Sequence, residues 1–594
     1  MSLLSLLFFL SIAHLSTAGT IFTAPAQVTE SYDFIVVGAG TAGCVIANRL
    51  SEDSSIKVLV IEAGISDNGT ESSLISTPLL AGTGIGTIYD WNYTTTAQPG
   101  LNGRALGYPR GFVMGGSTSI NGMIYSRGSS EEYDRMARVS GDSGWSWDSL
   151  QKYIYKNERH TPPWNNRSNV GEFDPHVHGY GSLLTGLTPT VFEHDLRVIQ
   201  TTSEHPDMYP FNLDVNSGDG LGFGWLHATV GHGARSTSSS AYLHPALNSR
   251  SNIDLLLHSQ VTKLVETTPK TFNSVQVAQA LTAPKYEFTA SKEVILSAGA
   301  IGTPQILMLS GIGPANHLAS VGVPFIIDLP DVGNNLQDQV ILTLQYEVNG
   351  TTLSPFLNDD AAVGAALAQW AENRTGIAAG NTVVNTIGYL RLPFKSPLLS
   401  MGDPAAGPNS AHYQIAFLGT FYPNQGQTVP ATGNWMSISI VVQSPTSRGE
   451  VKLTSSSAFT HPSIDPAYFT TAFDIGTAIE AIRAAHKFIT TSAWDGFIIR
   501  PYADAANLTT DAQVEAYIRK FSSTLNHPTS TAKISKDTEE GGVVGPDLIV
   551  KGANRVRVVD ASILPAAVAG FPQAEVYIIA ERAADLVKET WGLT

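Results

Sequence analysis

The chain has 594 residues, a formal net charge of −16 and a composition that is 43% hydrophobic and 14% charged. This length exceeds what one simple core supports, so we expect two domains or one large composite. The negative charge argues against a nucleic acid or an anionic membrane as a partner, because both attract positively charged proteins. The single cysteine, Cys44, excludes an internal disulfide and a multi-cysteine metal site.

Residues 1–18 have features of a secretory signal peptide. An apolar run at 3–15 is followed by the small residues Ser16, Thr17 and Ala18, and it is too short for an ordinary transmembrane helix. A basic start is missing, so a membrane-tethering N-terminus is the alternative. No later segment has the length and apolarity to span a bilayer, so we expect secretion, with no membrane contact after signal cleavage. Six N-x-S/T sequons support this route and predict N-glycans at some of Asn68, Asn92, Asn166, Asn349, Asn373 and Asn507.

Residues 32–64 form the unit around which we expect the rest of the chain to be organised. Short apolar runs at 34–37 and 57–61 are typical of buried strands, and residues 41–50 between them have helical spacing. Glu62 follows the second strand, where it is placed to accept hydrogen bonds from a ribose hydroxyl. The order strand, glycine turn, helix, strand and acidic residue predicts a dinucleotide site, but it does not separate FAD from NAD.

The glycines of this unit form the pattern G-x-G-x-x-G. We expect Gly38 to make the tight turn and Gly40 to let a pyrophosphate approach the backbone, since it has no side chain. Gly43 lets the helix and strand pack closely. The pyrophosphate then lies at the helix N-terminus, where free N–H groups and the helix dipole favour negative charge.

The later segments predict further helices and strands. Residues 108–128 alternate glycines and small hydroxyls with apolar residues, which suits them to line an extended ligand. From 340 to 501, strand-like runs such as 435–442 and 450–453 alternate with Pro/Gly/Ser loops and predict an antiparallel sheet. Other expected elements are a helix at 145–158, a surface loop at 161–180, a helix at 234–247, strands at 253–265 and 292–298, a helix through 309, a strand at 556–560 and a closing helix at 576–588.

Five ordered motifs identify a family resemblance. After the opening unit come 111–128, with its Gly115-Gly116-Ser117 and Asn121-Gly122-Met123, then GAIGTPQILMLSGIG at 299–313, LPDVGNNLQD at 329–338 and RVVDASILP at 557–565. Together they resemble the glucose–methanol–choline (GMC) family of FAD oxidoreductases, in its fungal aryl-alcohol oxidase and dehydrogenase branch. The resemblance covers essentially the whole mature chain.

The resemblance implies a mixed α/β fold with a Rossmann-type FAD-binding domain and an inserted antiparallel-sheet substrate domain. The FAD-binding domain is expected at 31–329 and 505–594, and the substrate domain at 330–504, with 160–230 as a further insertion. The residues expected to bind FAD are Gly38, Gly40, Thr41, Ala42, Gly43, Glu62 and Val261 at the ADP half; Trp91, Met114, Ser117, Asn121, Gly122, Met123 and Ile124 along the pyrophosphate and flavin; and Asp560, Ala561, Pro572 and Gln573 at the isoalloxazine end.

The resemblance also bears on how FAD is held. Some members attach FAD covalently through a histidine immediately before the asparagine of the 111–128 motif. Ile120 occupies that position here. Since isoleucine offers no nucleophile, the sequence predicts noncovalent FAD.

The family's active-site histidine lies in an H-x-x-G-T element, which His527 matches, although Ser530 replaces the glycine. A neutral imidazole there can take the hydroxyl proton of an alcohol while a hydride leaves the carbinol carbon for flavin N5. The second catalytic position, usually His or Asn, is Phe571. Phenylalanine cannot orient a substrate hydroxyl. Loss of the hydrogen bond that His or Asn would make costs about 3 kcal/mol of transition-state stabilisation.

Three hypotheses follow from Phe571. In the first, His527 alone supports oxidation of a primary or aromatic alcohol, Phe571 stacks on an aromatic substrate, and O2 or another acceptor reoxidises the flavin. In the second, the protein is a non-redox cyclase or lyase similar to versicolorin B synthase, with His527 as acid/base and FAD structural. The third is a flavin-binding relic without enzymatic activity.

Metal chemistry has weaker support in the sequence. His176 and His178 form an H-x-H pair, but they lie in the expected surface loop without an obvious set of further ligands. A solvated loop is the favoured interpretation, so we predict no metal site.

Overall fold

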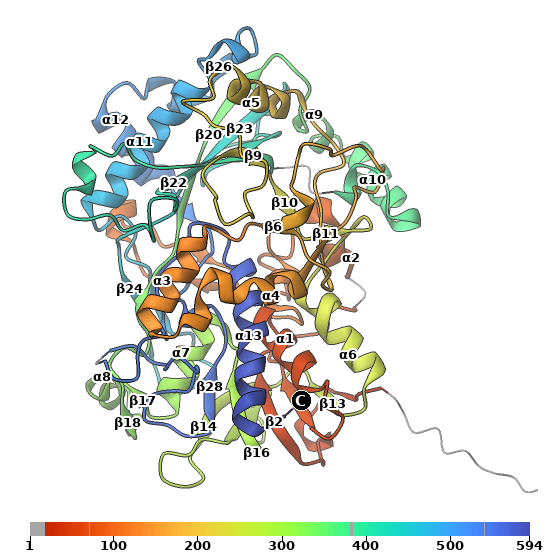
Figure 1. The fold of residues 1–594 in the computed structure, drawn as a ribbon, viewed down its shortest axis with the longest axis vertical. Coiled ribbons are helices and arrows are strands. Elements are labelled where there is room, and N and C mark those ends of the chain that lie inside the picture. Colours follow the sequence, from red (N-terminus) through yellow and green to blue (C-terminus); the bar gives the residue numbers. More distant parts are fainter. Residues whose placement is uncertain (1–17, 70–71, 381–383, 540, 594) are drawn as a thin grey trace, which may run out of the picture.

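The structure is a computed structural model that describes residues 18–69, 72–380, 384–539 and 541–593. The predicted signal peptide, 1–18, lies outside the described residues except for Ala18. Among the described residues, no helix combines the length and apolarity needed to cross a bilayer. Two large sheets dominate the described part, one in the lower half of the view in Figure 1 and one in the upper half.

The lower sheet has eight strands in the described chain, ordered β1-β13-β3-β2-β16-β15-β14, with β28 also paired to β16. Its pairings are parallel from β1 to β16 and at β28, while β14, β15 and β16 form an antiparallel meander. The strands are β1 Ile21–Phe22, β2 Tyr32–Val37, β3 Val58–Ile61, β13 Ile253–Leu256, β14 Gln260–Val265, β15 Ser274–Ala278, β16 Tyr286–Leu296 and β28 Val556–Val558.

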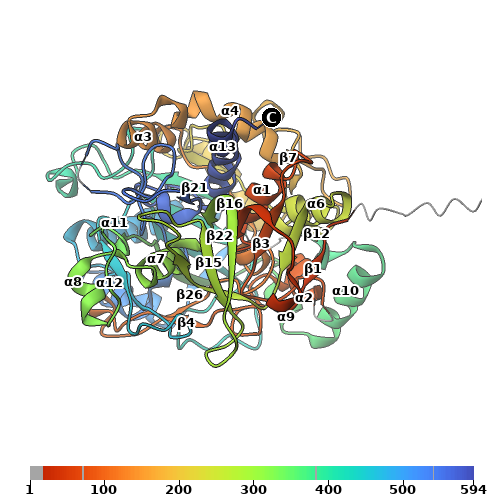
Figure 2. The ribbon, with the colours of Figure 1, turned by 90° about the horizontal axis from the view of Figure 1, so that it is seen from below.

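The helices of the lower half explain why its central strands are so apolar. Every residue of β3 is buried, as expected for a parallel strand that is covered on both faces. Helices α1 and α13 lie side by side in both views (Figure 1 and Figure 2), although they come from opposite ends of the chain. The helices here are α1 Thr41–Leu50, α3 Ser130–Ser140, α4 Trp147–Asn157, α6 His244–Ser249, α7 Gly299–Leu309, α8 Ala315–Ser320 and α13 Gln573–Trp591.

Two predicted elements of the lower half were wrong in detail. The predicted strand 253–265 is two strands on opposite sides of the sheet: β13 lies next to the edge strand β1, and β14 forms the other edge. His258 between them has φ of 55°, a left-handed conformation that ends a strand. The predicted helix 234–247 begins later, with a π-helical turn at Ser239–Leu243 leading into α6.

The upper sheet is antiparallel and has seven strands in the described chain, ordered β26-β20-β23-β22-β21-β9, with β27 paired to β20. Its own core is distinct from that of the lower half. The strands are β9 Gly222–Trp225, β20 Val340–Val348, β21 Val384–Leu390, β22 Tyr413–Leu418, β23 Trp435–Val442, β26 Ile498–Pro501 and β27 Ser523–Thr524; the helices around it are α5 Glu193–Glu204, α9 Ser354–Leu357, α10 Asp360–Asn373, α11 Ala472–Phe488 and α12 Asp511–Phe521.

The two sheets together form the predicted mixed α/β arrangement, which is confirmed. The upper sheet also takes strands β9 and β27 from outside the predicted substrate segment 330–504. Two smaller ladders lie outside the large sheets: β10 His227–Ala228 pairs with β6 Ile124–Tyr125, and β7 Glu158–His160 pairs with β8 Leu183–Thr185.

The predicted surface loop 161–180 is only partly at the surface. The side chain of His176 is 92% exposed, as expected for a loop residue, but that of His178 is only 3% exposed. The solvated interpretation was therefore wrong for His178. Hydrogen bonds from both of its ring nitrogens to buried carboxylates, those of Glu158 and Asp214, hold it inside the protein.

Candidate functional site

A cavity of about 660 Å³ is lined by residues of both halves of the molecule. Its lower end is bordered by the turn after β2, and its upper end by Gln414 of β22 and Ser439 of β23. Cofactor and substrate sites of this size form where two structural units meet. The cavity therefore has room for two functions, nucleotide binding below and substrate chemistry above.

The three glycines of the first turn have different surroundings. Gly38 has φ of 99°, which only glycine adopts readily. A Cβ on Gly43 would lie 1.9 Å from the carbonyl oxygen of Gly38, so this glycine allows α1 to pack against the turn. A Cβ on Gly40 would meet no protein atom closer than 3.9 Å, because this residue faces the cavity. The open space beside Gly40, at the start of α1, fits a pyrophosphate.

Glu62 lies at the end of β3 with both carboxylate oxygens directed by the backbone. Oε2 accepts a hydrogen bond from the N–H of Ala39 at 2.8 Å, and Oε1 accepts one from that of Gly64 at 2.7 Å. Burial raises the pKa of Glu62 to about 7, against the lowering effect of these two bonds. Each oxygen keeps a further acceptor position, and a ribose hydroxyl donating to it would favour the ionised form.

The turn at Gly115 and Gly116 closes directly over the first glycine turn. Both residues have positive φ, 84° and 53°, and a Cβ on Gly116 would lie 2.8 Å from the Cα of Gly40. Two glycine turns that are far apart in the sequence thus pack backbone against backbone. This contact leaves the neighbouring N–H groups and small hydroxyls beside the cavity rather than behind bulky side chains.

Asn121 connects this turn to α13. Its Oδ1 accepts hydrogen bonds from the N–H of Met123 at 2.9 Å and from Arg235 at 2.8 Å, while its Nδ2 donates to Gln573 Oε1 at 3.2 Å. Gln573 in turn donates to the carbonyl oxygen of Ile124. The amides of Asn121 and Gln573 therefore fix the two segments that border the middle of the cavity.

Most residues predicted to bind FAD line the cavity, namely Gly38, Gly40, Thr41, Ala42, Glu62, Trp91, Ser117, Asn121, Gly122, Met123, Ile124, Val261, Asp560, Ala561, Pro572 and Gln573. Gly43 does not, in keeping with its packing role. Met114 lies outside the lining, contrary to the expectation. It is fully buried in the core of the lower half, and its N–H donates to the carbonyl oxygen of Ile65 at 2.9 Å.

Asp560 is close to the cavity, but protein groups already satisfy its carboxylate. Oδ2 accepts from the N–H of Gly299 at 2.9 Å and from Thr303 Oγ1 at 2.6 Å, and Oδ1 accepts from the N–H of Ser562 at 2.8 Å. Burial raises its pKa above the ordinary value. Asp560 thus positions the glycine turn before α7, whose backbone faces the cavity.

His527 lies at the upper end of the cavity and is held from two sides. Its N–H donates to Asp338 Oδ1 at 2.8 Å, and its Nδ1 is 2.7 Å from Gln339 Oε1. The ring of Phe571 lies edge to face against it, with centroids 5.2 Å apart at 79°. Backbone, imidazole and ring face are all constrained, so the orientation of His527 is well defined.

Gln339 determines which nitrogen of His527 carries the proton. Its Nε2 donates to Gln443 Oε1 at 2.9 Å and to the carbonyl oxygen of Val568 at 2.8 Å, so Oε1 must be the group facing His527. An amide oxygen only accepts, so Nδ1 of His527 is the protonated nitrogen. Nε2 is therefore the unprotonated nitrogen of His527. Since His527 lines the cavity, Nε2 can accept a proton there.

His527 is neutral over the physiological pH range. Burial lowers its pKa to about 3, and the positive charge of Arg110 contributes in the same direction. Arg110 is fixed by hydrogen bonds to the carbonyl oxygens of Pro109 at 2.6 Å and Asn526 at 2.5 Å. The chain therefore maintains a neutral imidazole at the place where a base is expected.

Phe571 is 6% exposed and borders the cavity beside His527. It packs in an apolar cluster with Val215, Leu226, Ile387 and Ala416. Phe571 offers no hydrogen-bond donor. The side chain of Gln414, on strand β22, can supply the donor that a His or Asn at position 571 would have given. Gln414 lines the cavity and accepts from Gln443 Nε2 at 2.7 Å through its Oε1, which leaves its own Nε2 to donate.

The residues that sequence reasoning missed are Gln339, Gln414 and Arg110. Gln339 directly follows the motif at 329–338, which could have identified it. Gln414 is the one polar residue in the apolar run YQIAFL apart from its neighbouring tyrosine. Its role depends on partners from other strands, so the local sequence gives only a weak signal.

Comparison with known proteins agrees with this geometry. Two family profiles, both described as GMC oxidoreductase, match residues 32–341 and 445–580. Pyranose dehydrogenase 3 of Leucoagaricus meleagris is 37% identical over 574 residues, covering 94% of this chain and 93% of that protein. The structure of an Aspergillus oryzae formate oxidase, described with a modification of its FAD, has a TM-score of 0.86 at 26% identity and covers 96% of this chain and 99% of that one. A fungal aryl-alcohol oxidase shares the fold, with a TM-score of 0.79 at 24% identity, covering 95% of this chain and all of that one.

Proposed function

This chain belongs to the GMC oxidoreductase family, as its motifs predicted, and on that premise we propose that it is a secreted enzyme that oxidises a primary or aromatic alcohol. The family makes it a FAD-dependent oxidoreductase. The observation that carries the choice of reaction is the tautomer of His527, whose unprotonated Nε2 is available to a substrate hydroxyl.

In the proposed reaction the O–H proton of the alcohol passes to Nε2 of His527, and the carbinol carbon loses its hydride to become a carbonyl. FAD, when bound, supplies the acceptor of that hydride. Gln339 keeps Nδ1 protonated, so that Nε2 remains the base throughout. Gln414 donates its Nε2–H to the substrate oxygen, the contact that Phe571 cannot make. The neutral imidazole of His527 needs no prior deprotonation.

The upper end of the cavity supports a substrate with an apolar body. Apolar side chains of the upper sheet and its neighbours line the cavity, namely Ile341, Val384, Ala416, Leu418, Phe421, Leu525 and Phe571, and the last of these packs against His527. An aromatic ring presents a face that these side chains can cover without leaving polar groups unpaired. A pyranose, the substrate class in the name of one relative, carries several hydroxyls that each need a partner.

Anaerobic mixing of the purified flavoprotein with an aryl alcohol tests the proposal. We expect the flavin absorbance to bleach with an aryl alcohol, and to bleach more slowly with a pyranose at the same concentration. Product formed without bleaching would favour the non-redox cyclase or lyase instead. If every alcohol tested gives no bleaching and no product, the reaction we propose is rejected.

We further propose that FAD is bound noncovalently. Ile120 lines the cavity where a nucleophile would be needed for attachment at the family's usual position. Acid precipitation should therefore release all the flavin into the supernatant. Flavin that stays with the precipitated protein would contradict the proposal.

The proposed route of secretion is supported by the position of the sequons. The six asparagines Asn68, Asn92, Asn166, Asn349, Asn373 and Asn507 are all exposed. Expression in a eukaryotic secretory host should place the protein in the medium, with a mass that falls on removal of N-glycans. Retention of the protein in the cell with its full signal segment would contradict this route.

A further inference from the structure

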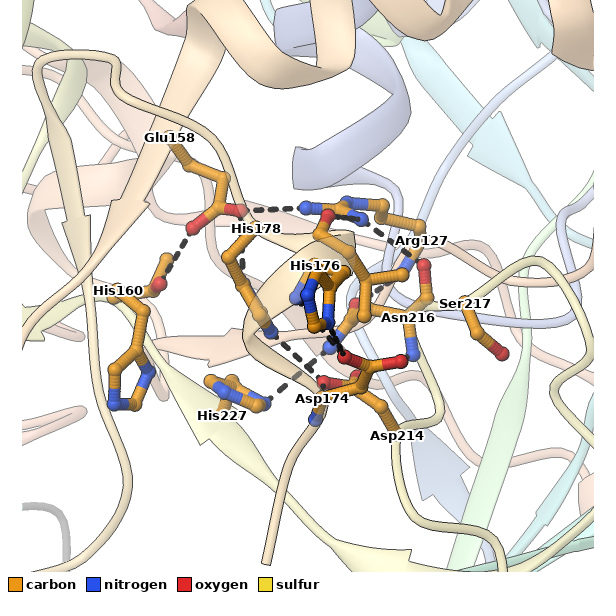
Figure 3. A network of polar contacts seen from close by, with 12 residues as sticks. Arg127, Glu158, His160, Asp174, His176, His178, Asp214, Asn216, Ser217 and His227 are labelled. Carbon is orange, nitrogen blue, oxygen red and sulfur yellow. Dashed lines mark hydrogen bonds and ion pairs between the residues drawn. The ribbon is translucent and has the colours of Figure 1, made fainter.

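Figure 3 shows a network of charged and imidazole groups, and its buried members Glu158, His178, Asp214 and His227 do not line the cavity and take no part in the proposed reaction. This cluster gathers His178 from the segment after β7, Asp214 from the loop before β9, and His227 from β10. All three side chains are buried, and one potential ligand atom from each lies within 4.8 Å of the other two. Among the described residues, these three form the one group of His, Cys, Asp or Glu side chains whose geometry could hold a metal ion.

The ring of His178 is oriented by carboxylates at both ends. Its Nδ1 is 2.9 Å from Glu158 Oε1, and its Nε2 is 2.9 Å from Asp214 Oδ2. Because both partners accept, both nitrogens carry protons in the chain alone. A cation between Nε2 and Oδ2 would replace one of these protons and leave the bond to Glu158 intact.

His227 is the least satisfied member of the cluster. It is 1% exposed, its Nε2 has no partner, and its Nδ1 has one long contact, 3.4 Å from the Nδ2 of Asn216. The rings of His178 and His227 lie with centroids 4.4 Å apart. A fully buried imidazole with so little hydrogen bonding costs free energy unless another group binds it.

We propose that His178, Asp214 and His227 bind a divalent transition metal ion, and that zinc is the ion they suit best. Two imidazoles and one carboxylate are the ligand set of many zinc sites with three protein ligands, which water completes. The absence of cysteine from the group argues against an ion that prefers sulfur.

The groups around the three ligands match what a bound metal requires. A metal-binding histidine commonly donates its other ring N–H to a carboxylate, as His178 does to Glu158. Glu158 is held in turn by Arg127 at 2.5 Å and by Thr185 Oγ1 at 2.6 Å. The N–H of Asp174 donates to Asp214 Oδ2 at 3.1 Å, which orients that carboxylate.

The third imidazole, His160, lies at the edge of the cluster. Its ring stacks on Phe173 with centroids 3.9 Å apart and lies 5.3 Å from that of His227. Its Nδ1 has no partner. This nitrogen is available to a water molecule on the metal.

The position of the site indicates what the metal would do. His227 pairs with Tyr125 in the two-stranded ladder of β10 and β6, and the neighbouring Ile124 lines the flavin cavity. A metal would therefore join the segment after β7, the loop before β9, and the strand that backs the cavity. We assign it a stabilising role for the 160–230 segment, separate from alcohol oxidation.

The test uses the full-length flavoprotein without a polyhistidine tag. The protein is stripped with a chelator, loaded with Zn²⁺, passed through a desalting column and analysed for metal by mass spectrometry. We expect about one zinc per chain and a higher unfolding temperature than for the stripped protein. Loading with Co²⁺ should give the visible absorption bands of a tetrahedral site at wavelengths longer than those of the flavin.

Variants identify the ligands. His227→Phe and Asp214→Asn should each lose the retained zinc and the rise in unfolding temperature, while His176→Ala, an exposed histidine of the same segment, should keep both. Flavin content reports that each variant is folded. Wild-type protein that retains no zinc, or zinc retention unchanged in both ligand variants, would overturn the proposal. So would loss of zinc from His176→Ala alone.

Discussion

Two histidines of this chain have opposite surroundings: His527 is half-buried in the cavity wall, and His178 is buried inside the protein. His527 faces an amide oxygen and a nearby arginine, and burial with that arginine lowers its pKa to about 3. His178 faces Glu158 and Asp214, and although burial opposes it, hydrogen bonds to these carboxylates raise its pKa above the ordinary value. One imidazole is kept neutral, as the proposed base requires, and the surroundings of the other favour its charged form.

The comparison shows that burial alone does not decide what a histidine can do. Desolvation lowers the pKa in both places, and the neighbours decide the result. An amide orients the ring of His527 without stabilising its charged form, which suits a proton acceptor. Two carboxylates stabilise the charge of His178, which suits an ion pair or, after exchange of a proton, a metal ligand.

The largest effect we expect is from His527→Ala. Removing the base should lower kcat by about 10³-fold, within the range known for general bases, while the flavin spectrum stays unchanged. His178→Gln should leave kcat per bound flavin within about twofold, because this residue is remote from the substrate. Steady-state assays normalised to flavin content measure both. Comparable losses of kcat in the two variants would break the distinction between the two histidines.

A smaller effect, on stability, is expected from Glu158→Gln. This change keeps the shape but removes the charge that pairs with Arg127 and His178, so we expect a loss of about 3 kcal/mol in the free energy of unfolding. Denaturant unfolding of chelator-treated protein measures it. The control is Glu172→Gln, whose pair with Arg167 is partly exposed and should contribute less than about 1 kcal/mol. Equal losses of unfolding free energy in the two variants would show that the buried pair of Glu158 contributes no more to stability than the partly exposed pair of Glu172.

Gln339→Glu should make the surroundings of His527 resemble those of His178. A carboxylate beside Nδ1 raises the pKa of the imidazole, so the protonated, inactive form appears at higher pH. A rise of about 1–3 units from the wild-type value of about 3 brings this pKa to at most about 6, so we expect up to about tenfold lower kcat/KM at pH 5 than at pH 8, a ratio that wild-type protein should not show. Gln339→Leu is the control, since it removes the acceptor without adding charge. If kcat/KM falls equally at low pH in Gln339→Glu and Gln339→Leu, the role assigned to Gln339 is refuted.

The smallest expected change concerns the pH dependence of the wild type. Because the pKa of His527 is lowered to about 3, the base stays unprotonated well below the ordinary histidine value, and kcat/KM should show no inflection near pH 6.5. The sign for stability is the reverse of that for a paired histidine. The unfolded chain binds the proton first, so this group's contribution to stability falls as pH drops from about 6.5 to about 3. An activity inflection near pH 6.5 would contradict the neutral assignment.

Much of the fold could be predicted, because its signals are local. The apolar spacing of residues 41–50 gave helix α1 with the bounds that the structure has, and the strand-like run at 435–442, where Ser437 and Ser439 alternate with apolar residues, did the same for strand β23. The division of 253–265 could not be read from periodicity, since both parts are apolar and only the backbone at His258 separates them. Helix α11 also went unpredicted, within a region that otherwise alternates strands and loops.

The site was predictable where a motif recurs at fixed spacing and not where partners come from distant strands. Gly38, Gly40 and Glu62 belong to one short unit, so the sequence could place them together at one cavity. Gln339, Gln443 and Gln414 form a chain of amides between the segment just before β20, the segment after β23, and β22. Nothing in any one of those segments shows that the three meet beside His527. The burial of His178 was missed for the same reason.

The pairing of α1 with α13 has a consequence for how the protein is made. The cavity is bordered by residues from Gly38 near the start of the chain to Gln573 near its end, and the Asn121–Gln573 contact closes its middle. A chain that emerges from the ribosome N-terminus first has the glycine turn after β2 early but lacks one wall of the cavity until the final helix is synthesised. We therefore expect the cavity to close only late in synthesis, and a chain truncated before α13 to contain the glycine motif without a closed cavity.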